Sequence, residues 1–207
     1  MFRKVKLLIF RLFLAHCRRR LRRKGVEVAD DAIINMLPSV RMAPGSRIIL
    51  HKGVTVTSNP RHNPLLLHPV QLHLVAPNAV IEMEEGSGIC GSSLICCSRI
   101  SIGKYTIIGP NTLLYDSEGH NYVPGRGWTK HDIRTGSPIT IGDECYIGAN
   151  CIILSGVTIG NNCVVSAGCV ITEDVPAGHK ASGNPAVYTP LPKLLGGPGR
   201  KKPAKTA

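Results

Sequence analysis

The chain has 207 residues and a mass of 22.2 kDa, the size of one domain with tails. Apolar residues make up 43% and charged residues 18%, which excludes a wholly unfolded chain, while 4% aromatic residues, 22 Gly and 15 Pro predict an aliphatic core with many turns. The net charge of +12 lies in the two ends, since residues 25–192 hold ten basic against all 13 acidic residues, so the body offers no basic surface to a nucleic acid.

Residues 1–24 predict a basic amphipathic helix, with ten Lys or Arg residues and no acidic residue. The apolar run 7–15 is interrupted by Arg11, lacks a small-residue cleavage site and is shorter than the ~20 residues of a spanning helix. Six apolar residues share one helix face: Phe2, Val5, Leu8, Ile9, Leu12 and Phe13. We expect this face either to dock on an anionic membrane surface or to pack on the protein's own oligomer. Because residues 1–24 do not resemble an export signal, we expect a cytoplasmic protein, with peripheral contact to the inner face of the membrane under the first alternative.

Aliphatic residues recur every six positions from residue 44 onward. Three stretches show this before residue 115: Pro44, Leu50, Val56; Met83, Ile89, Ile95; and Ile102, Ile108, Leu114. Thr106 and Thr112 fill the fifth place of the six-residue unit. A spacing of six fits neither a helix nor a hairpin. It indicates one short strand and one turn per unit, with the aliphatic side chain inside a coil.

The six-residue pattern stops between Leu114 and Ile139. The intervening sequence YDSEGHNYVPGRGWTKHDIRTGSP holds the only Trp, two His and six charged residues. We expect a single long loop to leave the rigid coil here, a form that binding loops often take. Residues 116–120 would then lie at the rim of the coil.

The strongest repeats follow from residue 141. The first position of seven consecutive units is aliphatic: Ile141, Ile147, Ile153, Ile159, Val165, Ile171 and Ala177. The fifth position is small or β-branched: Cys145, Cys151, Val157, Cys163, Cys169, Val175 and Ala181. Gly and Asn between these positions supply the turns.

These units resemble the hexapeptide-repeat family of left-handed parallel β-helices, over about residues 75–190. The resemblance implies an all-β fold in which three units form one triangular coil, so that residues eighteen apart stack. We therefore expect a basic N-terminal segment at 1–40, a β-helix domain with a protruding loop at 41–190, and a basic tail at 191–207.

The eight Cys are predicted to be reduced thiols that fill small core positions. Cys145 would stack on Cys163, and Cys151 on Cys169, at the spacing of neighbouring strands. That spacing tolerates a disulfide where the strand geometry allows one. No two Cys have the Cys-x-x-Cys spacing of a zinc site.

The order of motifs is similar to that of sugar O-acetyltransferases of the maltose and galactoside acetyltransferase type. The matching stretches are ISIGKYTIIGPNTLLYDSEGHNY, SPITIGDECYIGANCIILSGVTIG, VVSAGCVITEDVPAG and ASGNPA. The resemblance implies transfer of an acetyl group from acetyl-CoA to a sugar or glycan precursor, with no metal. It also implies a homotrimer with sites between its subunits. His120 stands at the place of the family's catalytic histidine.

An imidazole suits that place, because it can take the proton of a sugar hydroxyl as the hydroxyl attacks a thioester. Asp116 is the first candidate to hold the other ring nitrogen of His120, and Glu118 or a backbone carbonyl would also serve. His131 is either an acceptor-loop or a surface residue. The remaining histidines are expected to be structural or exposed: His16, His51, His62, His68, His73 and His179.

By the same resemblance, acetyl-CoA lies in a groove between coils of adjacent subunits. The matching positions are Tyr146, Ala149, Ala167, Gly168, Thr172, Gly183, Asn184 and Pro185. Small residues there let an extended thiol arm approach the backbone. Two phosphate contacts of the family are missing at Glu173 and Val187, and Lys180, Lys193 or the tail would supply them. Candidate acceptor contacts are Ser92, Ser93, Arg126 and Trp128.

Three other functions stay open at this point. The same scaffold could acetylate the nitrogen of an amino-sugar nucleotide or an antibiotic. A γ-type carbonic anhydrase needs three convergent His ligands, whereas the sequence offers only His120 and His131 in one loop. A non-catalytic β-helix scaffold would need neither a His at the loop rim nor the closing GNPA motif.

Overall fold

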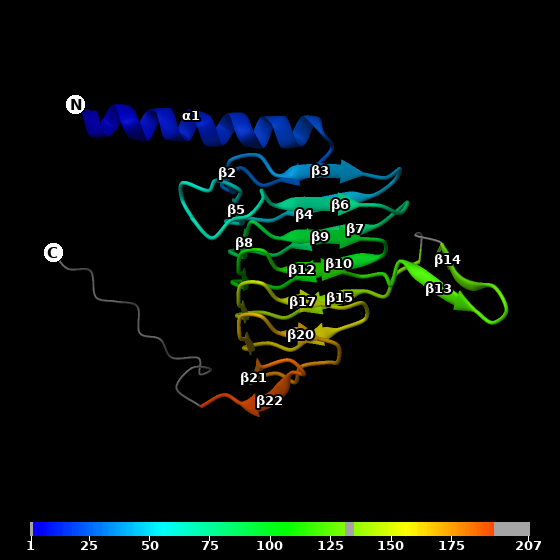
Figure 1. Ribbon diagram of the computed structural model, residues 1–207. Helices are drawn as coiled ribbons and strands as arrows, with labels where there is room; N and C mark the ends of the chain where they lie inside the picture. The colour runs from blue at the N-terminus through cyan, green and yellow to red at the C-terminus, as the bar shows by residue number, and fades with distance from the viewer. Residues whose placement is uncertain (1, 131–134, 193–207) are drawn as a thin grey trace.

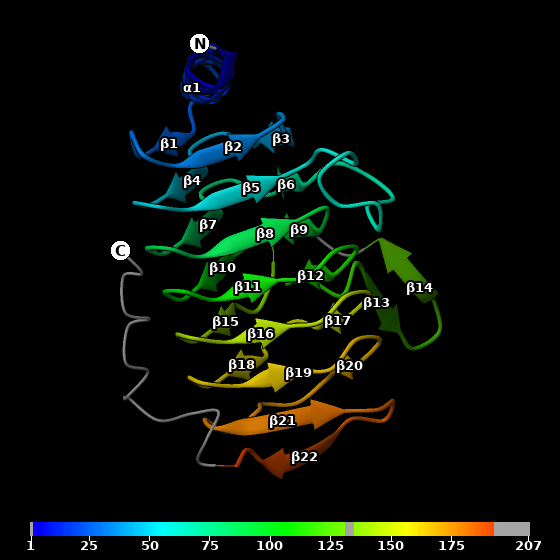
Figure 2. The same ribbon diagram turned by 90° about the vertical axis from the view of Figure 1, so that its left-hand side faces the viewer.

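The computed structural model describes residues 2–130 and 135–192. Their strands form three parallel sheets on the sides of a triangular coil, with one helix across one end (Figures 1 and 2). Each strand pairs with the strand one coil further along the chain. This arrangement confirms the predicted β-helix.

Each sheet takes one strand from every coil. Sheet A contains β1 (Glu27–Val28), β4 (Arg47–Leu50), β7 (Val80–Met83), β10 (Arg99–Ile102), β15 (Ile139–Ile141) and β18 (Thr158–Ile159). Sheet B contains β2 (Ile33–Asn35), β5 (Thr55–Thr57), β8 (Gly88–Cys90), β11 (Ile107–Ile108), β16 (Tyr146–Ile147), β19 (Val164–Val165), β21 (His179–Ser182) and the antiparallel β22 (Val187–Pro190). Sheet C contains β3 (Ser39–Met42), β6 (Gln71–Leu74), β9 (Ser93–Cys96), β12 (Leu113–Tyr115), β17 (Ile152–Ile153) and β20 (Val170–Ile171).

The first position of the repeat points into the coil, as predicted, over most of the chain. Ile141 and Ile147, for example, are at most 1% exposed. The prediction was wrong for Pro44 and Ala177, which are exposed, and for Ile95, which is only half-buried. Leu94 is buried instead of Ile95, because five residues rather than six separate it from Ile89. Since the side-chain period of a strand is two, one missing residue turns the next side chain outward.

The fifth position of the repeat ties successive coils together. The buried Thr106 hydroxyl donates to the carbonyl of Gly142 (2.7 Å) and accepts the N–H of Cys145 (2.9 Å). The thiol of Cys145 in turn donates to the carbonyl of Gly160 at 3.1 Å. Cys145 and Cys163 occupy matching positions in adjacent coils, since the residues that follow them pair in register. All eight cysteines are free, which confirms their prediction as thiols, but Cys90 is only half-buried and does not fill a core position as expected.

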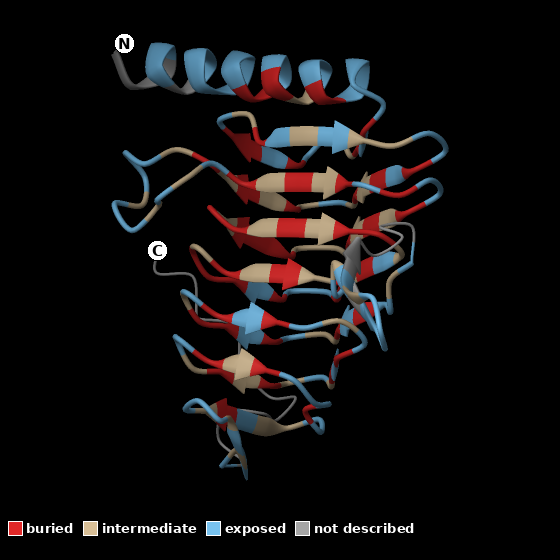
Figure 3. Ribbon diagram, turned by 45° about the vertical axis from the view of Figure 1, so that its right-hand side comes forward, coloured by how far each residue is buried: buried red, intermediate tan, exposed pale blue. Residues whose placement is uncertain are grey.

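The N-terminal helix α1 (Phe2–Arg23) covers the first coil with its C-terminal half (Figure 3). Leu14, Cys17 and Leu21 are the buried residues of this contact. The predicted domain boundary at residue 41 lies too late, because β1 at Glu27–Val28 already belongs to sheet A. Among the described residues, no helix is long and apolar enough to cross a membrane.

The coil is interrupted twice, not once as expected. Residues 58–70 leave between β5 and β6 and lie at the edge between sheets B and C, on the side opposite the hairpin β13–β14 (Figure 1). Asn111 holds this segment, because its side-chain oxygen accepts the N–H of Leu67 and its amide donates to the carbonyl of Leu65. The repeats on both sides of residues 58–70 are imperfect, so the break does not stand out in the sequence.

The free thiols give a direct test of the core. Burial raises the pKa of Cys145 to about 11 and also raises the pKa of Cys151, Cys96 and Cys97, so these thiols stay protonated at neutral pH. We expect an aromatic disulfide reagent to react quickly only with the half-buried Cys90 in the folded protein, and with all eight thiols after unfolding. Absorbance of the released thiolate measures this. The variant Cys90→Ser should lose the fast phase, and a fast reaction of several thiols in the folded wild type would contradict the packing.

Candidate active site

The second interruption of the coil begins where β12 ends at Tyr115 and closes where β15 begins at Ile139. Between them, β13 (His120–Val123) and β14 (Gly127–Lys130) form an antiparallel hairpin that projects from the edge between sheets C and A (Figure 1). His120 is the first residue of this hairpin and is exposed. His131 lies outside the described residues.

Asp116 fastens the base of the hairpin to the coil. Its carboxylate is fully buried and accepts the backbone N–H groups of Cys97 (2.6 Å) and Ser98 (2.8 Å) in the preceding coil. Its main-chain carbonyl accepts the N–H of Ser137 and the hydroxyl of Ser155, both at 2.8 Å. Both ends of the excursion are therefore tied to the coils on either side. These hydrogen bonds make Asp116 a structural residue, a role different from the predicted contact with His120.

Gly136 is needed for this closure. A Cβ atom at Gly136 would lie 2.5 Å from the carbonyl oxygen of Asp116, a distance that real Cβ atoms essentially never show. The returning chain thus passes directly against the departing chain. The Asp116 carboxylate also accepts the Cys96 thiol at 3.4 Å, and together with burial it raises the pKa of Cys96, so this thiol is held in its neutral form.

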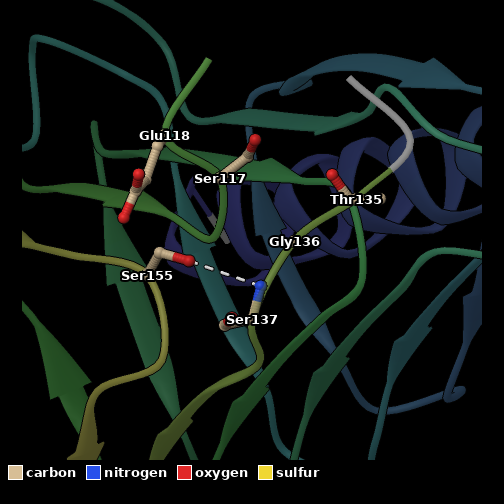
Figure 4. A pocket seen from close by; sticks show the side chains of 6 residues that line it. All are labelled: Ser117, Glu118, Thr135, Gly136, Ser137 and Ser155. Carbon is tan, nitrogen blue, oxygen red and sulfur yellow. Dashed lines mark hydrogen bonds between the residues drawn. The ribbon is translucent and has the colours of Figure 1, made fainter. Parts of the chain in front are cut away.

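Two adjacent cavities open at the base of the hairpin and share Ser117, Glu118 and Ser155. The first, of about 230 Å³, is also lined by Thr135, Gly136 and Ser137 (Figure 4). The second, of about 430 Å³, is also lined by Tyr115, Leu154 and Thr172. Hydroxyl groups and one carboxylate dominate the first lining, which suits a ligand with several hydroxyl groups. His120 lies two residues beyond Glu118 in the chain.

Part of the repeat region matches known proteins. Residues 138–173 match the family model described as the hexapeptide repeat of succinyl-transferase. Nodulation protein L of Rhizobium leguminosarum bv. viciae is 51% identical over 89 residues, which cover 43% of this chain and 45% of the relative. The candidate acetyltransferase YvoF of Bacillus subtilis is 45% identical over 93 residues, 44% of this chain and 48% of the relative. Residues 138–173 therefore carry the hexapeptide repeat, and part of the chain is similar to proteins named as acetyltransferases.

The alignments of this hexapeptide-repeat protein span less than half the length of those two relatives. Similarity in fold covers more of the chain than similarity in sequence does. The crystal structure of the polysialic acid O-acetyltransferase OatWY superposes with a TM-score of 0.61 over 87% of this chain and 90% of that chain, at 18% identity. At this identity the likeness concerns the β-helix alone.

The positions predicted for acetyl-CoA in the hexapeptide-repeat protein fall on two edges of sheet C. Thr172 follows β20 at the edge between sheets C and A and lines the second cavity. Ala149, Ala167 and Gly168 lie in stacked turns at the opposite edge, between sheets B and C, where Gly168 donates its N–H to the carbonyl of Ala149 at 2.9 Å. A single chain therefore does not bring these two groups together.

The other predicted cofactor contacts lie on or below sheet B. Tyr146 and Lys180 are exposed in one outward column, separated by Val164 in the register of the sheet. Gly183, Asn184 and Pro185 form the exposed turn between β21 and β22. Lys193 lies outside the described residues. Whether these positions contact acetyl-CoA stays a prediction.

One predicted acceptor contact needs correction. Ser92 is fully buried, and its hydroxyl donates to the carbonyl of Gly109 at 2.6 Å and accepts the N–H of Thr112, so it joins two coils and does not reach solvent. Ser93 lies half-buried at the start of β9. Trp128 is 75% exposed on the hairpin and packs edge-on against Tyr122, with ring centres 5.6 Å apart, and Arg126 is exposed near the hairpin turn.

The described residues bring together one set of three possible metal ligands: His51, Glu82 and Glu84 on sheet A. His51 forms a hydrogen bond with Glu82 at 2.9 Å, and Arg99 pairs with the same carboxylate. We therefore interpret these residues as an ion-pair cluster. It holds one histidine, whereas the carbonic anhydrase alternative requires three. His120 is remote from it in the fold, since it belongs to the hairpin.

The sequence interpretation missed Ser137 and Ser155 as lining residues. A usable signal existed, because the two serines are eighteen residues apart and three hexads place such residues one above the other. The bond from the Ser137 N–H to the Ser155 hydroxyl, 3.3 Å long, shows this stacking (Figure 4).

We predict that Asp116→Ala destabilises the fold. The variant leaves the buried N–H groups of Cys97 and Ser98 without an acceptor, which should lower the free energy of unfolding by about 2–4 kcal/mol in urea titrations. The control Asp30→Ala removes an exposed partner of Arg22 and should cost less than about 1 kcal/mol. Wild-type stability of Asp116→Ala would contradict this structural role of Asp116.

Proposed function

We propose that the chain transfers the acetyl group of acetyl-CoA to a hydroxyl group of a sugar or glycan precursor, with His120 as the general base. One observation carries this proposal. The exposed His120 begins a hairpin whose base is lined by Ser117, Glu118 and further hydroxyl groups, and this base is bonded to a rigid coil that carries the hexapeptide repeat.

In the proposed reaction, one ring nitrogen of His120 takes the proton of the acceptor hydroxyl while that oxygen attacks the thioester carbonyl carbon. The tetrahedral intermediate then collapses, the carbon–sulfur bond breaks, and the imidazolium returns its proton to the thiolate of CoA. The products are an acetyl ester and CoA with a free thiol. Hydrogen-bond donors near the carbonyl would hold the oxyanion, and backbone N–H groups of a neighbouring coil suit that role.

The cavity lining fits a polyhydroxylated acceptor. Glu118 offers a carboxylate that accepts hydrogen bonds, while Ser117 and Ser155 can both donate and accept. Glu118 is exposed, in contrast to the buried Asp116, so it is available to a ligand. We therefore propose Glu118 as an acceptor contact beside Ser93, Arg126 and Trp128.

A site that spans two copies of the chain follows from the two edges of sheet C. His120 and Thr172 belong to the C–A edge, whereas Ala149, Ala167 and Gly168 belong to the B–C edge. We propose that the C–A edge of one copy meets the B–C edge of another, and that the thiol arm of acetyl-CoA lies between them. A closed ring of three copies would repeat this contact, as heterologous interfaces do when the rotation closes.

The first test is His120→Ala. We expect acetyl transfer to fall about 100-fold or more, since general-base catalysis contributes that much, with an unchanged thermal midpoint because the side chain is exposed. Release of CoA thiol over a panel of sugar acceptors measures the rate. His16→Ala, at an exposed position of helix α1 that belongs to neither edge of sheet C, is the matched control and should keep wild-type activity.

Product chemistry separates the two kinds of acceptor. An acetyl ester is cleaved by alkaline hydroxylamine, whereas the amide expected from the N-acetylation alternative resists it. Full activity of the folded His120→Ala variant would remove the proposed mechanism.

Mixed oligomers test the shared site. Ala167→Trp should fill the B–C edge and inactivate the protein, as His120→Ala does at the other edge. Co-assembly of the two inactive variants should restore about a quarter of wild-type activity, because sites that combine an intact edge from each variant form at that frequency in random trimers. Ala177→Trp, which is exposed outside the proposed site, is the control. Inactive mixed oligomers would show that each site lies within one copy.

A further inference from the structure

The helix α1 uses only one side of its surface to hold the β-helix. Leu14, Cys17 and Leu21 are buried against the first coil, and they follow the spacing of a single helix face. Arg18 and Arg22 reinforce the contact by donating to the carbonyls of Ala32 (2.9 Å) and Val28 (3.0 Å). The orientation of the helix on the coil is thereby set by contacts in its C-terminal half.

The side of α1 that faces away from the coil is apolar in its N-terminal half. Val5, Leu8, Ile9 and Leu12 are between 49% and 62% exposed. They are spaced at i, i+3, i+4 and i+7, so they form one stripe, and at 100° per residue Leu12 lies directly opposite Leu21. Four large aliphatic side chains on one exposed stripe are more than the scattered apolar residues of an ordinary surface.

The same side is basic in its C-terminal half. Arg19 and Arg23 continue the stripe at i+7 and i+11 from Leu12, and both are exposed. We call the residues Val5, Leu8, Ile9, Leu12, Arg19 and Arg23 the outer face of α1. An apolar stretch followed by guanidinium groups on one helix face is typical of helices that lie in a membrane interface.

Charge complementarity identifies the partner. Residues 1–24 contain ten basic residues and no acidic one, so a second copy of the helix would bring further positive charge to the same surface. An acidic protein would match the charge but would also need an apolar groove for the four aliphatic side chains. An anionic bilayer supplies both, because anionic phosphate groups cover an apolar layer.

We propose that the outer face of α1 docks on a membrane surface that contains anionic phospholipids. The aliphatic residues enter the boundary between headgroups and acyl chains, and Arg19 and Arg23 bind lipid phosphates. The helix would lie flat on the membrane, with the first coil of the β-helix beneath it and the hairpin β13–β14 several coils away (Figure 1). This inference does not depend on the proposed activity, since it concerns helix α1 and none of the residues proposed for acetyl transfer.

Vesicle flotation of the full chain tests the proposal. We expect binding to vesicles of phosphatidylcholine mixed with phosphatidylglycerol, weaker binding to phosphatidylcholine alone, and a decrease at high salt. Arg19→Gln/Arg23→Gln should lower the partition coefficient roughly 25-fold, about fivefold for each charge removed. Leu8→Asp/Leu12→Asp should abolish binding. All four side chains are exposed, so the thermal midpoint should not change.

Matched control variants make the same kinds of substitution outside the outer face of α1. Leu65→Asp/Leu67→Asp alters two exposed leucines of the 58–70 segment, and Lys52→Gln/Arg61→Gln removes two exposed basic residues, so both should bind like the wild type. Three results would overturn the proposal: no binding to anionic vesicles, equal losses in the outer-face and control variants, or a change of oligomeric state in the outer-face variants, which would identify a second copy as the partner of this face.

Discussion

The main-chain hydrogen bonds between successive coils are the constraint on which the other features depend. Gly148 shows how close the coils lie, because its N–H donates to the carbonyl of Val165 at 2.8 Å and a Cβ on Gly148 would lie 2.5 Å from the nitrogen of Ala167. This spacing leaves room inside only for aliphatic side chains and for small ones at the fifth position. It also explains why hydroxyl and thiol groups at that position, such as those of Thr106 and Cys145, bond to the next coil.

Two irregular segments leave the rigid coil, and both leave at edges of sheet C. The hairpin that carries His120 leaves at one edge and is held there by the buried Asp116, while residues 58–70 leave at the other edge and are held by Asn111. Functional residues can therefore lie on these two segments while the six-residue repeat of the coil stays intact. Because Asp116 is bonded to the backbone of both neighbouring coils, the position of the cavity residues Ser117 and Glu118 depends on the packing of the whole solenoid.

The helix end of the molecule and the edges of sheet C have separate tasks in this arrangement. Leu14, Cys17 and Leu21 close the first coil and leave the outer face of α1 free, so the proposed membrane contact is far from the hairpin along the axis of the coil. The proposed acyl transfer uses the edges of sheet C. Variants of the helix and variants of the hairpin can therefore be compared without mutual interference.

The sequence by itself determined the fold, because a six-residue period of aliphatic residues such as Ile141 and Ile147 is compatible only with short strands and turns that bury one position per unit. It also indicated the helix, the free thiols and the excursion that carries His120. The tertiary structure decided what depends on contacts between coils: the outward turn of Ile95, the burial of Ser92 and the hydrogen bonds of Asp116. The period of a repeat is a local property, whereas the partners of a polar side chain are set by whichever coil lies beside it.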